Sequence, residues 1–109
     1  MKEIKINVTL GKDGDIECHP DPANVGRGEN QIIWRCTTPD ASLDAIEIEQ
    51  GKGKPTWPGS KPTKQPDGTI SATDPVTGSK VEKFKYSVTV ARDGTTYSID
   101  PEIRNDPNG

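Results

Sequence analysis

The sequence predicts an all-β protein, a single antiparallel Greek-key β-sandwich of seven to eight strands that spans residues 1–109. Apolar and polar residues alternate along most of the chain, and this period of two places one set on a core face and the other in water. Glycine, proline and aspartate gather between the alternating runs, where short connections between strands use them. Hydrophobic residues make up 28% of the chain, so the expected core is thin.

The alternating runs and the turns between them define the expected strands. Ile4 and Ile6 begin the first run, and the hairpin signal Lys12-Asp13-Gly14 follows it, because glycine adopts positive φ without a Cβ clash. The segment from Asp40 to Gln50 mixes helical and strand periods, and we interpret it as a turn followed by a strand. In chain order, we expect strands over residues 4–10, 14–18, 22–25, 31–37, 45–49, 81–91 and 96–100, with an eighth near 69–72.

The second half of the chain has the longest alternating run and a second clear hairpin. The run over 81–91 is rich in β-branched and aromatic residues, and Arg92-Asp93-Gly94 connects it to the strand at 96–100. Pro66-Asp67-Gly68 places proline and glycine where a tight turn needs them, just before the eighth strand. The end of the chain, residues 104–109, is expected to be a loose tail.

Residues 51–69 interrupt the alternation and contain no aliphatic side chain; their sole large apolar residue is Trp57. A connection this long is uncommon in a compact domain unless it is functional or disordered. Trp57 could stack on a sugar, a base or a partner's surface, and lysines in the same loop favour an anionic partner. Trp57, Lys54 and Lys61 are therefore candidate ligand-binding residues. The alternative is that Trp57 folds back and caps the sandwich.

Two groups of motifs resemble a family of small, uncharacterised bacterial proteins with a cupredoxin-like β-sandwich. The first group runs from Cys18-His19-Pro20-Asp21-Pro22 through Val25 and Gly28 to Ile32-Ile33-Trp34, and the second consists of Phe84-Lys85-Tyr86-Ser87-Val88-Thr89-Val90 and Ile99-Asp100-Pro101-Glu102-Ile103-Arg104-Asn105. The resemblance implies a cupredoxin-like or immunoglobulin-like sandwich. It covers both ends of the chain but not residues 37–80, and it implies no catalytic residue.

Cupredoxins bind copper, so the resemblance raises the question of a copper site. The residues of this chain argue against a complete copper site. A blue-copper centre needs two histidines, one cysteine thiolate and a weak axial ligand, usually methionine. The chain has one histidine, His19, and one methionine, Met1. If Cys18 and His19 both lie in extended backbone, their side chains point to opposite faces. We therefore expect no metal and no other cofactor; the alternative is a metal-handling relative with an incomplete site at these two residues.

Cys18 and Cys36 are a candidate disulfide pair. If residues 14–25 and 31–37 form a hairpin around residues 26–28, the two cysteines come to nearly the same level and share the inward face. A disulfide needs Cα atoms within about 7 Å. It would close a loop of about 19 residues and stabilise the fold by roughly 3 kcal/mol in the entropic model. The alternative is two buried free thiols in a reducing compartment.

Composition and motifs exclude several classes of function. A sequence pI near 5.1 argues against a general nucleic-acid binder, and the longest apolar run, Ile32-Ile33-Trp34, is far too short to cross a membrane. The N-terminus lacks the apolar stretch of a signal peptide, which predicts a cytoplasmic protein, or a periplasmic or secreted one if a signal was removed.

No catalytic motif is present, so we do not expect an enzyme. The sequence favours a non-catalytic binding or self-associating module, whose expected edge strands, 4–10 and 96–100, would pair with a protein partner or a second copy. The alternatives are the metal-handling relative and a carbohydrate or polyanion binder that uses the Trp57 loop.

Overall fold

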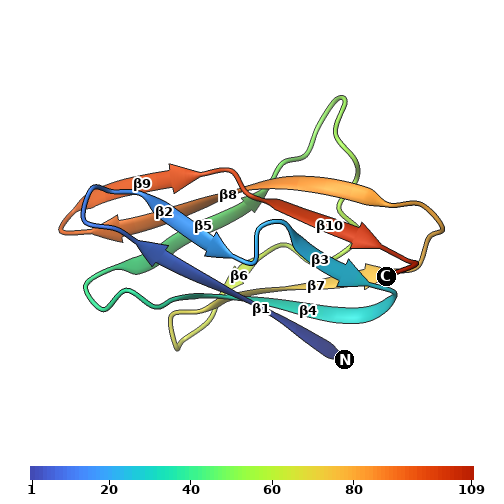
Figure 1. The fold of residues 1–109 in the computed structure, drawn as a ribbon, viewed down its shortest axis with the longest axis horizontal. Coiled ribbons are helices and arrows are strands. Elements are labelled where there is room, and N and C mark those ends of the chain that lie inside the picture. Colours follow the sequence, from blue (N-terminus) through green and yellow to red (C-terminus); the bar gives the residue numbers. More distant parts are fainter.

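A computed structural model describes all 109 residues, and it confirms an all-β chain without a helix, folded into two packed sheets (Figure 1). The ten strands are β1 (Lys2–Leu10), β2 (Ile16–His19), β3 (Ala23–Gly26), β4 (Gly28–Cys36), β5 (Ser42–Ile48), β6 (Thr63–Lys64), β7 (Ile70–Val76), β8 (Glu82–Arg92), β9 (Thr95–Ile99) and β10 (Glu102–Asp106). One sheet has the order β2-β1-β4-β7-β6. The other has the order β3-β10-β8-β5, with β9 also paired to β8.

Both sheets are mixed, so the expectation of a purely antiparallel sandwich is wrong. β1 runs parallel to β4, and β3 runs parallel to β10. The chain passes from one sheet to the other between β2 and β3, over residues 20–22, where two prolines lack the N–H that a continuing ladder needs. Residues 14–25 therefore do not form one arm of a hairpin with residues 31–37, because β3 and β4 lie in different sheets.

The last strand is the largest feature that the sequence pattern did not indicate. Residues 104–109 were expected to be a loose tail, yet β10 pairs with both β3 and β8. Its inward residues are Ile103 and Asn105, and an inward asparagine breaks the apolar alternation that marks a buried strand. Pro107 is buried as well, and its carbonyl accepts a hydrogen bond from Arg27 Nε at 3.3 Å.

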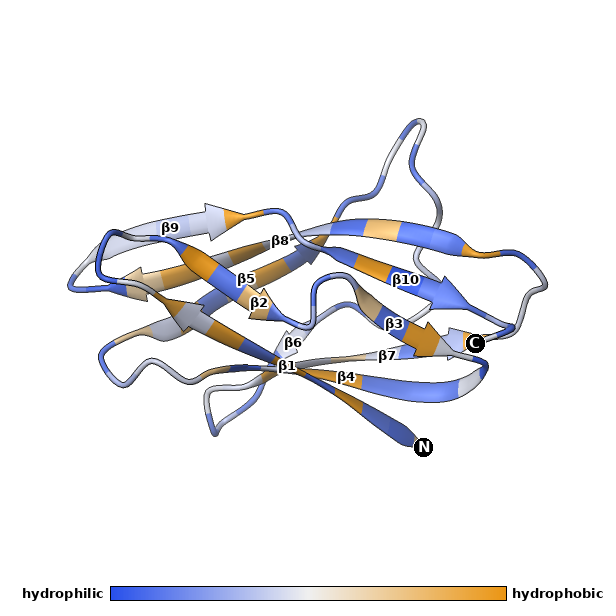
Figure 2. Ribbon diagram, in the orientation of Figure 1, coloured by the Kyte–Doolittle hydropathy of each residue, from blue (hydrophilic) through white to orange (hydrophobic).

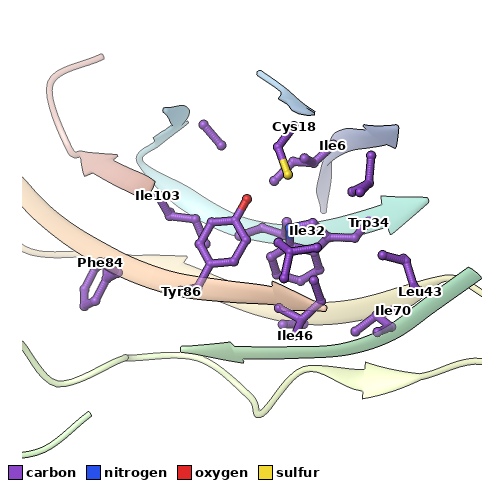
Figure 3. Packing of buried hydrophobic residues seen from close by; sticks show 14 of the residues in the cluster. Ile6, Cys18, Ile32, Trp34, Leu43, Ile46, Ile70, Phe84, Tyr86 and Ile103 are labelled. Atoms are coloured by element: carbon purple, nitrogen blue, oxygen red, sulfur yellow. The ribbon is translucent and has the colours of Figure 1, made fainter. Parts of the chain in front are cut away.

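The core lies between the sheets and consists of the inward set of each alternating run. Figure 2 shows the alternation as orange and blue bands along the strands. Trp34 and Tyr86 lie at its centre, fully buried, with ring centroids 5.5 Å apart in an edge-to-face arrangement. Figure 3 shows Tyr86 reaching from β8 toward Cys18 of β2. Burial in this apolar setting raises the pKa of the Cys18 thiol to about 11, so Cys18 is a protonated core residue at neutral pH.

The two cysteines are free thiols, and the expected disulfide does not form. β1 lies between their strands, and Val8 is the register partner of both Cys18 and Cys36. Neighbouring strands are about 4.8 Å apart. The Cα atoms of two residues at the same level on strands separated by a third strand are therefore farther apart than the roughly 7 Å that a disulfide allows. The parallel pairing of β1 with β4, which the sequence pattern did not reveal, is what separates them.

One end of the sandwich encloses a polar cluster that joins the two sheets. Asp74 of β7 is fully buried, and its Oδ1 accepts a hydrogen bond of 2.8 Å from Asn105 of β10. Asn30 of β4 donates to the Asp74 main-chain carbonyl at 3.2 Å. The second carboxyl oxygen of Asp74 and the amide oxygens of Asn30 and Asn105 are buried acceptors without a donor. Burial raises the pKa of Asp74 to about 6, and the bond from Asn105 offsets part of this rise.

The unfolding free energy is therefore expected to fall as the pH rises from about 4 to about 6. In this range folded Asp74 holds a proton that the unfolded chain has lost, so deprotonation favours unfolding, by roughly 3 kcal/mol in total. Asp74→Asn keeps the acceptor and adds a donor, so it should flatten this pH dependence and stabilise the protein at pH 7. Denaturant unfolding at several pH values measures both effects, with Asp13→Asn, an exposed residue, as the control. Equal pH profiles for Asp74→Asn and wild type would contradict this assignment.

Candidate functional site

β5 is an edge strand of its sheet, and it hydrogen-bonds to β8 alone. The Glu49 N–H donates to the Lys85 carbonyl at 2.9 Å. Successive residues of an antiparallel strand direct their main-chain groups alternately to its two sides. Glu47 and Glu49 therefore face β8, whereas the N–H and C=O groups of Ile46 and Ile48 point to the free edge. The β8 side agrees with this alternation. Tyr86 lies opposite Ile48, but its N–H points away from β5 and donates to the Pro101 carbonyl at 3.0 Å.

Of the two edge strands expected from the sequence, only one is an edge in the structure. Residues 4–10 were expected to be an edge, but β1 lies between β2 and β4 in the interior of its sheet. Residues 96–100 were also expected to be an edge, and β9 is one, since it pairs only with β8. A strand over 45–49 was expected, but its position at the edge of a sheet was not, because long-range pairing decides which strands are neighbours. The irregular register between Leu43 and Ala45 accounts for the mixed period over residues 40–50.

The segment of residues 49–62, here called the strap, connects β5 to the opposite sheet and projects from the sandwich beyond the end of β5 (Figure 1). Short contacts hold its first half in place. Lys54 forms an ion pair of 2.9 Å with Glu49. The Gln50 side chain donates to the Pro55 carbonyl and accepts from the Trp57 N–H, each at 3.2 Å. The strap is therefore an ordered loop tied to the end of β5.

Gly59 and Ser60 anchor the second half of the strap to β7. The Ser60 N–H lies 3.3 Å from the Thr73 carbonyl oxygen, and the Thr73 N–H donates to Ser60 Oγ at 2.8 Å. At Gly59 the two main chains touch, because a Cβ there would lie 1.7 Å from the Thr73 carbonyl oxygen. Only glycine fits this approach. The edge of β7 is thereby covered, while the edge of β5 is not.

Trp57 folds back onto the sandwich, as one of the two sequence interpretations expected. Its ring packs edge-to-face on Phe84 of β8, with centroids 5.0 Å apart and planes at 85°. Its indole N–H donates to the Ser60 carbonyl at 2.9 Å. Because Trp57 is half-buried, one part of it extends the core while another remains at the surface.

A groove follows the free edge of β5 between that strand and the strap. Its main cavity has a volume of about 330 Å³ and is lined by Ile46, Glu47, Ile48, Gln50, Trp57, Gly59, Lys61 and Pro62. A second hollow of about 240 Å³ shares four of these residues and continues along β5 past Asp44 to Lys64 of β6. The groove thus combines aliphatic and aromatic walls with a few polar groups, the usual make-up of a binding site.

Two of the three candidate ligand-binding residues line this groove. Trp57 and Lys61 do, whereas Lys54 does not, since its ammonium is paired with Glu49. The same hydrogen-bonded pair raises the pKa of Lys54. Sequence reasoning missed the other wall, which β5 supplies through Ile46, Glu47 and Ile48.

The residues considered for metal binding do not converge. Cys18 is buried and faces the core, whereas His19 is exposed on the other face of β2 beside Glu17, 3.4 Å away. The chain contains no group of three or more His, Cys, Asp and Glu side chains arranged to hold a metal ion. Nor does it contain a helix long and apolar enough to cross a membrane.

Comparisons with known proteins add no assignment to this groove. Neither a search of protein-family models nor a search of curated proteins found a match to the chain.

Gly59→Ala is expected to detach the strap, because the added methyl group would collide with the main chain of β7. We expect a loss of about 2 kcal/mol in unfolding free energy and faster tryptic cleavage after Lys52 in the strap. Gly78→Ala is the matched control, since a Cβ there meets nothing closer than 4.0 Å. Denaturant unfolding and limited proteolysis measure the two effects. If both variants behaved alike, the strap would not depend on this contact.

Proposed function

We propose that the protein is a non-catalytic binding module that takes an extended polypeptide segment as an additional strand on β5. The observation that carries the proposal is the coincidence of two features along one edge. Ile46 and Ile48 direct unpaired main-chain donors and acceptors to the free side of β5, and a cavity of about 330 Å³ lies along that side. Strand addition uses main-chain hydrogen bonds for affinity and side-chain pockets for specificity.

The edge of the other sheet that borders the same groove, formed by β6 and β7, supports this choice by contrast. β6 is only two residues long, and the strap covers the edge of β7 at Thr73. Short strands and covering loops are common ways in which proteins prevent unwanted edge pairing. β5 has one such device, the irregular register between Leu43 and Ala45, and regular pairing resumes from Ala45 to Ile48. The regular part of β5 is the part that borders the groove.

Contacts in the strap favour polypeptide over the alternatives that the sequence raised. A sugar-stacking tryptophan needs a free ring face and often its N–H, but the Trp57 N–H is already bonded to Ser60 and its ring packs on Phe84. The separation of Cys18 from His19 on β2 argues against the metal-handling alternative. We retain the cupredoxin-like or immunoglobulin-like, Greek-key classification of the sandwich as a proposal; the passage of the chain between sheets at residues 20–22 supports it.

Two proline substitutions test the proposal. Ile48→Pro removes an N–H that faces the groove and Ser98→Pro removes one that faces the free edge of β9, so neither substitution breaks a ladder hydrogen bond. Peptides selected on wild-type protein from a displayed random heptapeptide library should bind Ile48→Pro at least about ten-fold more weakly and Ser98→Pro equally well. Absence of any enriched peptide, or equal loss in both variants, would overturn the proposal. Thermal unfolding checks that both variants fold.

A further inference from the structure

We infer that the segment bound on β5 carries an apolar–basic–apolar sequence, with its lysine or arginine opposite Glu47. This inference rests on the proposed strand addition and specifies the partner that the same groove selects. It follows from three properties of β5: the side to which each main-chain group points, the face on which each side chain lies, and the charges that lack a partner.

The alternation of main-chain groups along β5 determines which ligand residues face the groove. In an antiparallel pairing, the ligand residues opposite Ile46 and Ile48 exchange main-chain hydrogen bonds with them. Directly opposite residues share a face of the sheet. Ile46 is buried and Ile48 is half-buried, so both lie on the core face. The two ligand side chains opposite them therefore enter the cavities beside Trp57 and Pro62, where apolar groups are favoured.

The ligand residue between these two lies opposite Glu47, on the outer face. Glu47 is exposed, and its partner on the β8 side is Ser87, which carries no charge. No ion pair involves Glu47, whereas its neighbour Glu49 is already paired with Lys54. Asp44 adds a second unpaired carboxylate at the far end of the groove. A cation opposite Glu47 is the cross-strand pair that this edge lacks.

The same charges argue against a second copy of β5 as the occupant. If two β5 strands paired antiparallel with Ile46 opposite Ile48, Glu47 would lie directly opposite Glu47 of the second copy. Like charges at directly opposite positions destabilise a strand pair. Lys61 of the strap and Lys64 of β6 line the groove across from β5, and neither forms an ion pair with Glu47 or Asp44. The geometry therefore points to a different polypeptide with a basic residue at the central position.

Two blocked peptides that differ at one position test the inference. The sequences are Thr-Thr-Val-Lys-Val-Thr-Thr and Thr-Thr-Val-Glu-Val-Thr-Thr, acetylated and amidated, and the dissociation constants come from NMR titrations that follow the amide signals of residues 44–50. Wild-type protein should prefer the lysine peptide by about three- to ten-fold at low salt, and Glu47→Lys should prefer the glutamate peptide.

A control variant separates local pairing from net charge. Glu3→Lys makes the same change of charge on β1, at an exposed residue outside the groove, and it should retain the wild-type preference. Equal affinity of wild-type protein for both peptides would overturn the inference and leave strand addition standing. No shift at residues 44–50 with either peptide would overturn both. A reversal of the peptide preference in Glu3→Lys would also overturn the inference, since the net charge of the protein would then set that preference.

Discussion

The contact between Gly59 and Thr73 is the constraint on which the open side of the sandwich depends. The strap leaves β5 and reaches the other sheet only because two main chains can touch there, where any side chain at position 59 would collide. With Ser60 bonded to Thr73, the β7 edge is covered, and Trp57 is drawn back onto Phe84. The groove is the space that this arrangement leaves beside β5.

The polar cluster at one end of the sandwich acts differently from the apolar core. Asp74 and Asn105 join the two sheets by one hydrogen bond, at the expense of burying acceptors that lack donors. Burial of a charged carboxylate destabilises the fold, so this end favours the protonated acid. The groove and the cluster draw on different strands, since the groove is lined chiefly by β5 and the strap, whereas the cluster lies on β4, β7 and β10.

Local sequence pattern predicted the strands well where the core residues are aliphatic, and poorly where they are polar. Period two identified the strand that contains Tyr86 and Val88, and the unusual composition of residues 51–69 drew attention to Trp57. It missed β10, whose inward Asn105 resembles a surface residue, and it could not reveal that β1 pairs in parallel with β4. Long-range pairing is a property of the whole fold, which is why the disulfide prediction failed.

Amide hydrogen exchange of the free protein, followed residue by residue along β5, tests the central claim most directly. If the N–H groups of Ile46 and Ile48 point into an open groove, they should exchange rapidly, while those of Glu47 and Glu49 should be protected by their bonds to β8. Such an alternation would establish the free edge on which strand addition depends. Uniform protection of all four amides would mean that the edge is already covered, and it would contradict the account.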